Sequence, residues 1–384
     1  MAATNANKRW FLVGALSLAL GILLLILLPI CGCQRGSESR RSTGAPALDV
    51  DSTKLLRTRV VATLDTPLHP GTNLIWCASF QLAWKEFATA LKEKQPVVEG
   101  AEALCRQLNA AADPRDSLPV GGFYAAAGKV ADGIVARIRN DMQQAFPSVP
   151  LPKMEGFQPD DLVAYAFLEA NVQFKLPYLD SDSPIPFRES RWRKPTVMMF
   201  GIGCSKTNAS PELRGQVSVL FYEKTGREMD AFALDLDRNS SPYQLIVARL
   251  APQATLASTV KFLEDQLAAV PQGGSEHGLG GHDTLLVPEM NWRILREFVE
   301  LEGRRFLNPS LREYWVRRAA QGVSFRLDRS GAALQSDAII RMMKGRPRHF
   351  ECDRPFLIYM KKRGADQPFF VAWIDNAELL RRWE

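Results

Sequence analysis

The sequence predicts an α+β protein in which helices dominate early in the chain and strands of largely antiparallel sheets dominate later. Apolar residues recur at helical spacing in two segments before residue 150, whereas later segments are short and β-rich. The chain has 384 residues, of which 46% are hydrophobic and 23% charged, so it can bury a core of ordinary size. This composition excludes disordered, collagen-like and small disulfide-rich proteins.

The chain is only weakly basic. It carries 48 Lys and Arg against 42 Asp and Glu, a formal net charge of +6, with no long basic block. Such a small and scattered excess does not indicate binding to a polyanion, so we expect no nucleic-acid partner.

The N-terminus predicts contact with a membrane. Lys8 and Arg9 precede an apolar run over residues 10–30, long enough to cross the roughly 30 Å hydrocarbon core as a helix. The run exceeds the roughly 7 to 15 apolar residues of a simple secretory signal. We therefore predict that residues 1–33 are a signal peptide or membrane anchor and that the rest of the chain is extracytoplasmic.

The end of this run, Ile30-Cys31-Gly32-Cys33, resembles a bacterial lipoprotein cleavage motif, with an aliphatic residue three positions before a cysteine and a small residue just before it. The resemblance implies lipid attachment to the Cys33 thiol. An uncleaved helix is the main alternative, and the arginines at positions 35, 40 and 41 leave an anchor in the opposite orientation open.

A tether and one domain are expected after the anchor. Residues 34–52 are rich in Ser, Arg, Gly and Asp and hold almost no large apolar side chains, so they cannot offset the entropy lost on ordering. We predict a flexible tether there. The composition of residues 53–384 is uniformly globular, with no repeat or low-complexity tract, which predicts a single domain.

Periodicity predicts the elements of this domain. Residues 73–94 and 129–146 each place large apolar side chains on one face of a helix, and residues 259–269 form a third helical stretch. In the second of these segments the apolar face consists of Val130, Ile134, Ile138 and Met142. Strands are predicted in the β-rich segments 162–174, 216–222, 243–251, 284–287, 322–327, 355–360 and 368–374.

Four cysteines lie in the predicted domain, namely Cys77, Cys105, Cys204 and Cys352. In an oxidising compartment they could form two disulfides in any of three pairings, or remain unpaired and buried. Cys77 could also be the nucleophile of a cysteine hydrolase, because a helix start lowers the pKa of a thiol. Packing in the core is the simpler interpretation, since no local Cys-His signature accompanies it.

A Gly-rich loop over residues 273–281 carries or adjoins Glu276, His277, His282 and Asp283, which are residue types that bind metals. Nothing in such a loop fixes a closed tetrahedral set, so we expect a solvated loop and no metal.

The C-terminal third contains two motifs in sequence. Residues 322–338, GVSFRLDRSGAALQSDA, form an alternating strand that ends at an acidic turn and is followed by a glycine and small residues. Residues 350–356, FECDRPF, come shortly afterwards, and two strand-like segments then end the chain. These motifs resemble the strand, hinge and C-terminal hairpin of the serpin family.

Three upstream segments are similar to serpin strands. They are 285–290 (LLVPEM), 170–175 (ANVQFK) and 73–79 (NLIWCAS), the last resembling a strand that runs into a helix. The resemblance implies helices packed on large, mainly antiparallel sheets, with an exposed loop before the C-terminal hairpin. Cys77-Ala78 and Gln321 stand where serpins usually have Ser-Pro and a histidine that hydrogen-bond behind the large sheet, so this latch is altered.

The resemblance implies a suicide-substrate inhibitor of a serine or cysteine protease rather than an enzyme, and it requires no cofactor. The loop over residues 331–350 would be the bait, and its N-terminal part would enter the sheet after cleavage. The hinge falls on Gly331, Ala332 and Ala333. The scissile bond lies among Met342, Met343, Lys344, Gly345 and Arg346, because the loop is slightly short on its far side.

A non-inhibitory function is the alternative. Leu334, Gln335, Ser336 and Asp337 are larger or more polar than the residues of an inserting hinge. Burying Gln335 or Asp337 unpaired would cost several kcal/mol. On sequence alone we therefore expect that cleavage of the loop adds little stability, and a serpin-fold binding or scaffold module of the cell envelope remains open.

The anchor yields a first prediction. Deleting residues 10–30 should release the protein from the membrane fraction, because soluble proteins do not leave such an apolar run exposed to water. A labelled fatty acid should be incorporated by the wild-type chain and by the control Cys31→Ala but not by Cys33→Ala. Label retained in Cys33→Ala would contradict lipidation, and membrane association without any label would indicate an uncleaved helix.

Overall fold

The computed structural model describes residues 48–149, 154–224, 230–270, 278–330 and 347–383. Ala45–Glu384 form one compact unit, and the other unit, Met1–Gly44, lies outside the described residues together with the predicted anchor. No helix in the described ranges is long and apolar enough to cross a membrane.

Ordered structure begins inside the segment predicted as a tether, residues 34–52. The first strand is β1 (Leu48–Asp51), which a short 3-10 turn η1 (Ser52–Lys54) follows. β1 pairs in parallel with β14 (Met290–Glu297), with Leu48 opposite Trp292. Hydrogen bonds to the edge of an existing strand thus order a segment whose composition alone predicted no structure.

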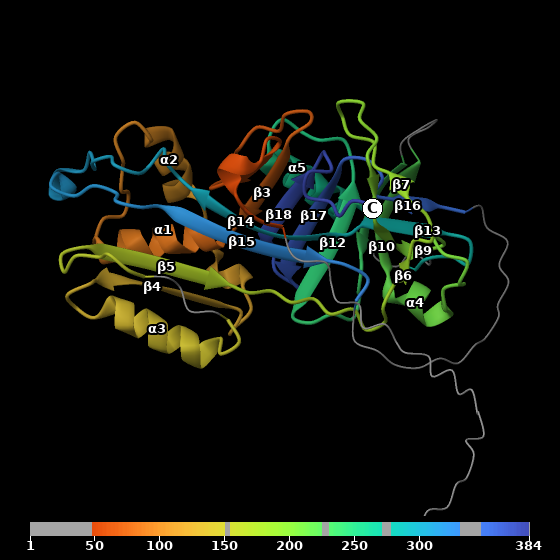
Figure 1. Cartoon of the computed structure of the whole chain (residues 1–384), viewed down its shortest axis with the longest axis horizontal. Coiled ribbons are helices and arrows are strands. Elements are labelled where there is room, and N and C mark those ends of the chain that lie inside the picture. Colours follow the sequence, from red (N-terminus) through yellow and green to blue (C-terminus); the bar gives the residue numbers. More distant parts are fainter. Residues whose placement is uncertain (1–47, 150–153, 225–229, 271–277, 331–346, 384) are drawn as a thin grey trace, which may run out of the picture. The chain divides into compact units, whose positions relative to one another are not determined.

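A seven-stranded sheet has the C-terminal hairpin in its middle (Figure 1). All seven residues of the last strand are buried, as are the first five of the strand before it. Neighbouring strands are antiparallel except for β2 and β3. In spatial order the strands are β10 (Ser218–Lys224), β11 (Asp230–Asp235), β12 (Tyr243–Arg249), β17 (Phe356–Lys362), β18 (Pro368–Ile374), β3 (Asn73–Cys77) and β2 (Thr58–Val61).

Four smaller sheets complete the strand arrangement. The first consists of β1, β14 and β15 (Ala320–Leu327), and the second of β16 (His349–Glu351), β13 (Thr284–Pro288), β9 (Met199–Ile202) and β6 (Leu179–Asp180). Two hairpins stand alone, β4 (Phe123–Lys129) with β5 (Leu162–Leu168), and β7 (Ile185–Pro186) with β8 (Thr196–Val197). The predicted α+β class with mainly antiparallel sheets is confirmed.

The first predicted helix is in fact a strand followed by a helix. Residues 73–77 form β3, and α1 (Ser79–Ala90) follows after Ala78. All five residues of β3 are buried because the strand lies between β2 and β18, and burial on both faces leaves no periodicity that separates strand from helix. The strand running into a helix that the serpin-like segment 73–79 implied is therefore present.

The other helices are α2 (Glu102–Ala110), α3 (Ile134–Ala145), α4 (Pro211–Gln216) and α5 (Leu256–Ala269), with 3-10 turns η2 (Pro114–Ser117) and η3 (Pro309–Leu311). α3 buries Ile134, Ile138 and Met142 as predicted, whereas Val130 precedes the helix. α3 packs on one face of the β4–β5 hairpin, and α1 contacts both strands as well. The hairpin is therefore held by two helices.

The strand predicted over residues 162–174 ends early. β5 stops at Leu168, and residues 170–175, which resemble a serpin strand, form no strand. At the end of this segment, main-chain N–H groups donate to side chains instead of to a neighbouring strand. Asp237 accepts from the Lys175 N–H (3.0 Å), and Gln216 accepts from the Leu176 N–H (2.7 Å). Because these groups are satisfied locally, no ladder is needed there.

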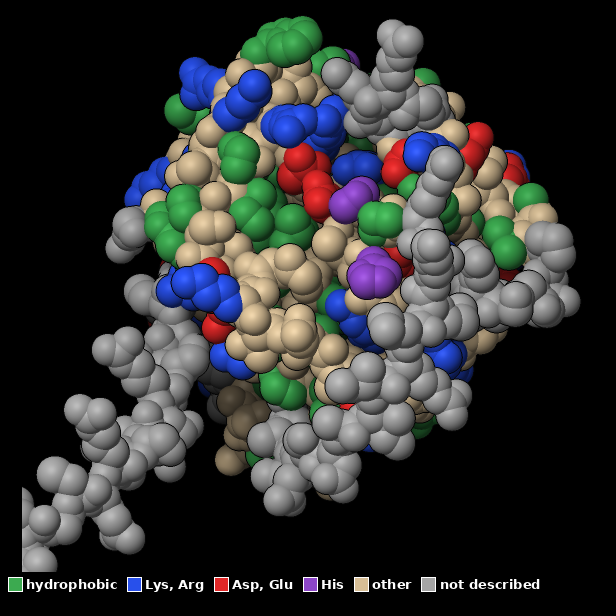
Figure 2. Space-filling model, turned by 90° about the vertical axis from the view of Figure 1, so that its right-hand side faces the viewer, with side chains coloured by type: hydrophobic (Ala, Val, Ile, Leu, Met, Phe, Trp, Pro, Cys, Tyr) green, Lys and Arg blue, Asp and Glu red, His purple; other side chains and the backbone are tan. Residues whose placement is uncertain are grey.

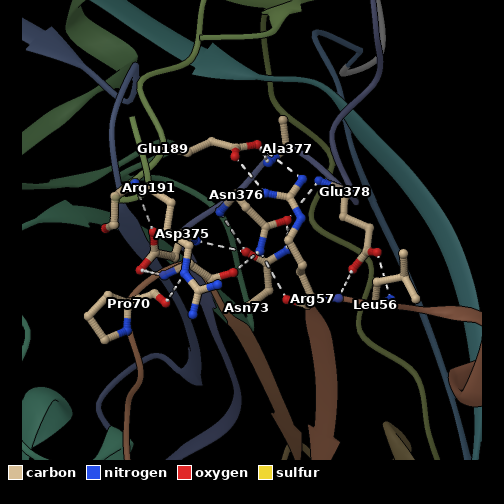
Figure 3. A network of polar contacts seen from close by, with 12 residues as sticks. Leu56, Arg57, Pro70, Asn73, Glu189, Arg191, Asp375, Asn376, Ala377 and Glu378 are labelled. Atoms are coloured by element: carbon tan, nitrogen blue, oxygen red, sulfur yellow. Dashed lines mark hydrogen bonds and ion pairs between the residues drawn. The ribbon is translucent and has the colours of Figure 1, made fainter. Parts of the chain in front are cut away.

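A buried polar network ties the two ends of the domain together (Figure 3). The side-chain oxygen of Asn73 accepts from the N–H groups of Asp375 (2.8 Å) and Asn376 (2.9 Å). Its amide nitrogen donates to Thr58 Oγ1 (3.0 Å) and to Asn376 Oδ1 (3.1 Å). Asn73 and Asn376 are fully buried, and each uses its hydrogen-bonding groups, so the network fixes β2, β3 and the end of β18 in one arrangement.

The position of the C-terminal hairpin yields a second prediction. A chain that ends at Ser330 should fail to fold, because β12 and β3 would lose β17 and β18 as partners and the apolar faces around them would be exposed. Circular dichroism and size-exclusion chromatography would measure this. A monomeric 1–330 fragment with a cooperative thermal transition would contradict the fold.

Candidate functional site

Two strands that contact α1 each have an edge without a ladder partner. β15 pairs with β14 on one side, and β5 pairs with β4, but no ladder joins β5 to β15 among the described residues. Both strands contact α1. We call the interval between them the seam.

The two ends of the seam are closed by polar contacts. Before the strands, Asp161 pairs with Arg317 (Oδ2 to Nη1, 3.1 Å). Beyond them, the Tyr178 N–H donates to the Arg329 carbonyl (3.1 Å), and Arg329 Nε donates back to the Tyr178 carbonyl (3.0 Å). These contacts show that β5 and β15 run in the same direction. The ion pair is about half exposed on the arginine side, so it contributes little, about 0–1 kcal/mol.

Gln321 of β15 forms the latch whose alteration the sequence indicated. Its side chain is buried, and its Nε2 donates to the Cys77 carbonyl (3.0 Å) and to Ser79 Oγ (2.9 Å) at the junction of β3 and α1. Its Oε1 is buried with no hydrogen-bond partner. An unsatisfied buried acceptor costs about 1–3 kcal/mol. This cost offsets part of the stabilisation that the two hydrogen bonds of Gln321 give to the contact between β15 and the start of α1.

The Cys77 thiol is not activated. Burial raises its pKa, and its Sγ contacts Ser79 Oγ at 3.5 Å, so the lowered pKa expected from a helix start is wrong. Burial likewise raises the pKa of Cys105 and Cys352, and that of the half-buried Cys204 to about 11. All four are free cysteines. A Cys77 nucleophile therefore lacks its chemical basis.

The segment that follows the loop is clamped by an ion pair. Asp283 accepts from Arg348 through the main-chain N–H (2.8 Å), Nε (3.0 Å) and Nη2 (2.7 Å). The side chains are 5% and 17% exposed. Burial raises the pKa of Asp283, but the hydrogen bonds from Arg348 outweigh burial and hold that pKa below its usual value. The clamp fixes the start of β16 beside β13.

Asp283 thus serves a different purpose from the metal ligation considered above. No group of three or more His, Cys, Asp or Glu that could hold a metal occurs in the described ranges. Glu276 and His277 lie outside the described residues. Sequence reasoning missed the clamp because Arg348 is 65 positions away and no local pattern connects the two residues.

The structure describes both flanks of the predicted reactive loop. On the near side, Asp328 accepts from the Ser330 N–H (2.8 Å) in the acidic turn after β15, and on the far side the clamp leads into β16. The hinge Gly331, Ala332 and Ala333 and the scissile region Met342, Met343, Lys344, Gly345 and Arg346 lie outside the described residues, as does Cys33. These assignments remain predictions.

Comparisons with known proteins concern the fold alone. No family model and no curated protein matches the sequence. Three solved serpin structures are similar over 79% of this chain: human thyroxine-binding globulin (11% identity, 92% of that chain, TM-score 0.46), mouse protein Z-dependent protease inhibitor (13%, 91%, 0.46) and protease nexin-1 with heparin (10%, 92%, 0.43).

The clamp yields a third prediction. Asp283→Asn should lower the free energy of unfolding by about 3 kcal/mol, because Arg348 would be left largely buried without a carboxylate. The matched control Asp180→Asn removes the partner of Arg329 in an exposed pair and should cost less than about 1 kcal/mol. Urea denaturation measures both, and equal effects would contradict the clamp.

The same comparison has a defined pH dependence. Because folding holds the pKa of Asp283 below the unfolded value of about 3.9, its contribution is complete above that pH and is lost as the pH falls through the folded pKa. The difference between wild type and Asp283→Asn should therefore be constant near neutrality and shrink below about pH 4. A difference that grows on acidification would contradict this assignment.

Proposed function

We propose that this chain is an extracytoplasmic serpin-like inhibitor that offers residues 331–350 to a serine or cysteine protease and then inserts the cleaved loop into the seam. The observation that carries the proposal is the seam itself, where β5 and β15 both contact α1 and each keeps an edge without a ladder partner among the described residues. Three residues separate the end of β15 from the loop, so the first residues of the loop follow one of the two strands of the seam.

The seam favours insertion energetically. β5 and β15 run in the same direction, so a strand that returns from the end of β15 would be antiparallel to both and could form ladders on its two edges. Each added hydrogen bond contributes about 1 kcal/mol. An insertion would have to part the exposed, weak ion pair of Arg317 and the two hydrogen bonds between Arg329 and Tyr178.

The alternation of β15 removes the objection raised by the polar loop residues. Gln321, Val323 and Leu327 are buried, whereas Gly322, Ser324 and Arg326 on the other face are exposed. An inserted strand shares these two faces. In one of its two registers Ala332, Leu334, Ser336 and Ala338 point inward, and Gln335 and Asp337 point to solvent. In that register insertion buries no charge.

A binding or scaffold module is the second candidate, and the latch favours it. Gln321 holds β15 to the start of α1 through two hydrogen bonds, and insertion in the opposite register would bury Gln335 and Asp337. Such a module would present the same loop and survive cleavage without a change in structure.

Cleavage distinguishes the two candidates and is the fourth prediction. Within the predicted scissile region, residues 342–346, a trypsin-like protease should cut after Lys344, since Pro347 protects the bond after Arg346. Insertion should then raise Tm by about 10 °C or more, at about 2 °C for each kcal/mol in a domain of this size. An SDS-resistant band at the summed mass should appear with the target protease. No rise and no band would contradict the inhibitor and support the module.

Two matched variants test the register. Leu334→Asp places a carboxylate on the inward face and should abolish the rise in Tm, whereas Gln335→Asp places one on the outward face and should leave it unchanged. The opposite result would retain insertion but overturn the proposed register.

A further inference from the structure

The turn between β7 and β8 exposes a tryptophan in a strained conformation. The Trp192 side chain is 91% exposed, and its φ of 68° lies in the left-handed region, which is unfavourable for a bulky residue by about 1 kcal/mol or more. The turn is closed by hydrogen bonds from the Trp192 N–H to the Glu189 carbonyl and from the Glu189 N–H to the Arg193 carbonyl, both 3.0 Å. Neither the solvent exposure of the Trp192 side chain nor its left-handed backbone conformation stabilises the fold.

The base of this turn is rigidly held (Figure 3). The Glu189 carboxylate is fully buried, pairs with Arg57 (Oε2 to Nη1, 2.5 Å) and accepts from the Ala377 N–H (3.0 Å). The next residue, Ser190, donates its N–H to Asp375 (3.2 Å). Trp192 is therefore presented from a fixed support.

A second exposed apolar side chain lies on the neighbouring segment. Leu56 is 90% exposed and immediately precedes Arg57, the partner of Glu189. Its N–H donates to Glu378 Oε1 (2.8 Å), which fixes its position. We call Arg191, Trp192, Arg193 and Lys194 the Trp192 surface; Leu56 is not part of it, because Figure 3 shows Leu56 and Arg191 on opposite sides of the polar network.

The charge of the Trp192 surface is uncompensated. Arg191, Arg193 and Lys194 are exposed, and none of them is paired with a carboxylate in the described part of the chain; Arg191 Nε donates to the Pro70 carbonyl (3.1 Å). The main chain of Arg382 forms an isolated β-bridge with Val197 of β8, so this residue adds a further cation near the turn. Figure 2 shows one face of the molecule, on which basic side chains gather near the top beside a protruding hydrophobic side chain, with acidic side chains directly below them.

We infer that the Trp192 surface docks onto the anionic lipid headgroups of the membrane in which the chain is anchored. An exposed tryptophan suits the interface between headgroups and acyl chains, and the cations beside it in the turn are attracted by anionic lipids. The inference goes beyond the proposed function and rests on the predicted N-terminal anchor.

The predicted tether makes such contact geometrically possible. The described chain starts at Leu48, eight residues before Leu56. Residues 34–47 reach at most about 50 Å when extended, so the domain stays close to the bilayer. Each cation near an anionic surface strengthens binding to that surface about fivefold. The factors of three or four unpaired cations multiply.

A second exposed tryptophan provides the control. Trp315, in the connection between β14 and β15, is 62% exposed. Its neighbours Arg317 and Arg318 are paired with Asp161 and Glu297, so the charge there is balanced and lipid attraction is not expected. This connection lies far from β7 in Figure 1.

The test uses the full chain reconstituted into vesicles whose acyl chains carry bromine, a quencher of tryptophan fluorescence. Subtracting the emission of Trp192→Phe from that of the wild type isolates Trp192, and Trp315→Phe isolates Trp315 in the same way. In vesicles containing phosphatidylglycerol, Trp192 emission should be quenched and shifted to shorter wavelength. It should recover in pure phosphatidylcholine and in high salt, while Trp315 should be unaffected throughout.

Charge variants sharpen the test. Arg193→Gln with Lys194→Gln should weaken docking about 25-fold, from about fivefold for each cation, and restore Trp192 emission. Arg317→Gln with Arg318→Gln is the matched control and should leave both vesicle binding and Trp192 emission unchanged. A chain that floats with vesicles while Trp192 remains unquenched would overturn the docking surface alone. A chain that does not float would overturn both the anchor and the docking surface.

Discussion

The fold depends on the pairing of its last strands with its first ones. β18 lies between β17 and β3, and Asn73 holds the main chain at Asp375 and Asn376 through hydrogen bonds that span about 300 residues of sequence. Because Asn73 is fully buried, losing either partner would leave amide groups unsatisfied in the core. The seven-stranded sheet therefore cannot close before the C-terminus is in place, and the elements packed on it depend on that closure.

The seam results from the way the strands pair within the separate sheets. β14 takes partners on both edges and β4 takes β5, so β15 and β5 each retain an edge within the described residues, although both pack on α1. Exposed edges are usually covered, because unpaired N–H and C=O groups attract another strand. Among the described residues, polar contacts join the two sides of the seam at its ends, and the Gln321 latch keeps an unsatisfied oxygen. The seam is therefore the best candidate for the place where a cleaved loop would insert.

The ion pairs differ in a way that fits this interpretation. Where the chain must be held, one carboxylate is almost wholly buried: Glu189 supports the β7–β8 turn, and Asp283 supports the start of β16. Where the strands would have to separate, the ion pair of Arg317 is exposed, and Arg329 is joined to Tyr178 by two hydrogen bonds without a buried carboxylate. A buried pair is costly to break from one side, whereas an exposed pair contributes little, so the fixed and separable parts of the molecule differ by burial.

The sequence by itself determined the features that depend on local pattern. The amphipathic face of α3, the strands of the C-terminal hairpin, the α+β class and the acidic turn after β15 all follow from spacing and composition within a few residues. Tertiary structure alone decided the features that depend on a distant partner. Residues 73–77, which helical periodicity assigned to a helix, form a strand because β18 lies beside them, residues 48–51 are ordered by the edge of β14, and Asp283 binds Arg348 where the sequence predicted a solvated loop. Burial likewise reverses the pKa expected for Cys77, since desolvation depends on what surrounds the thiol in space.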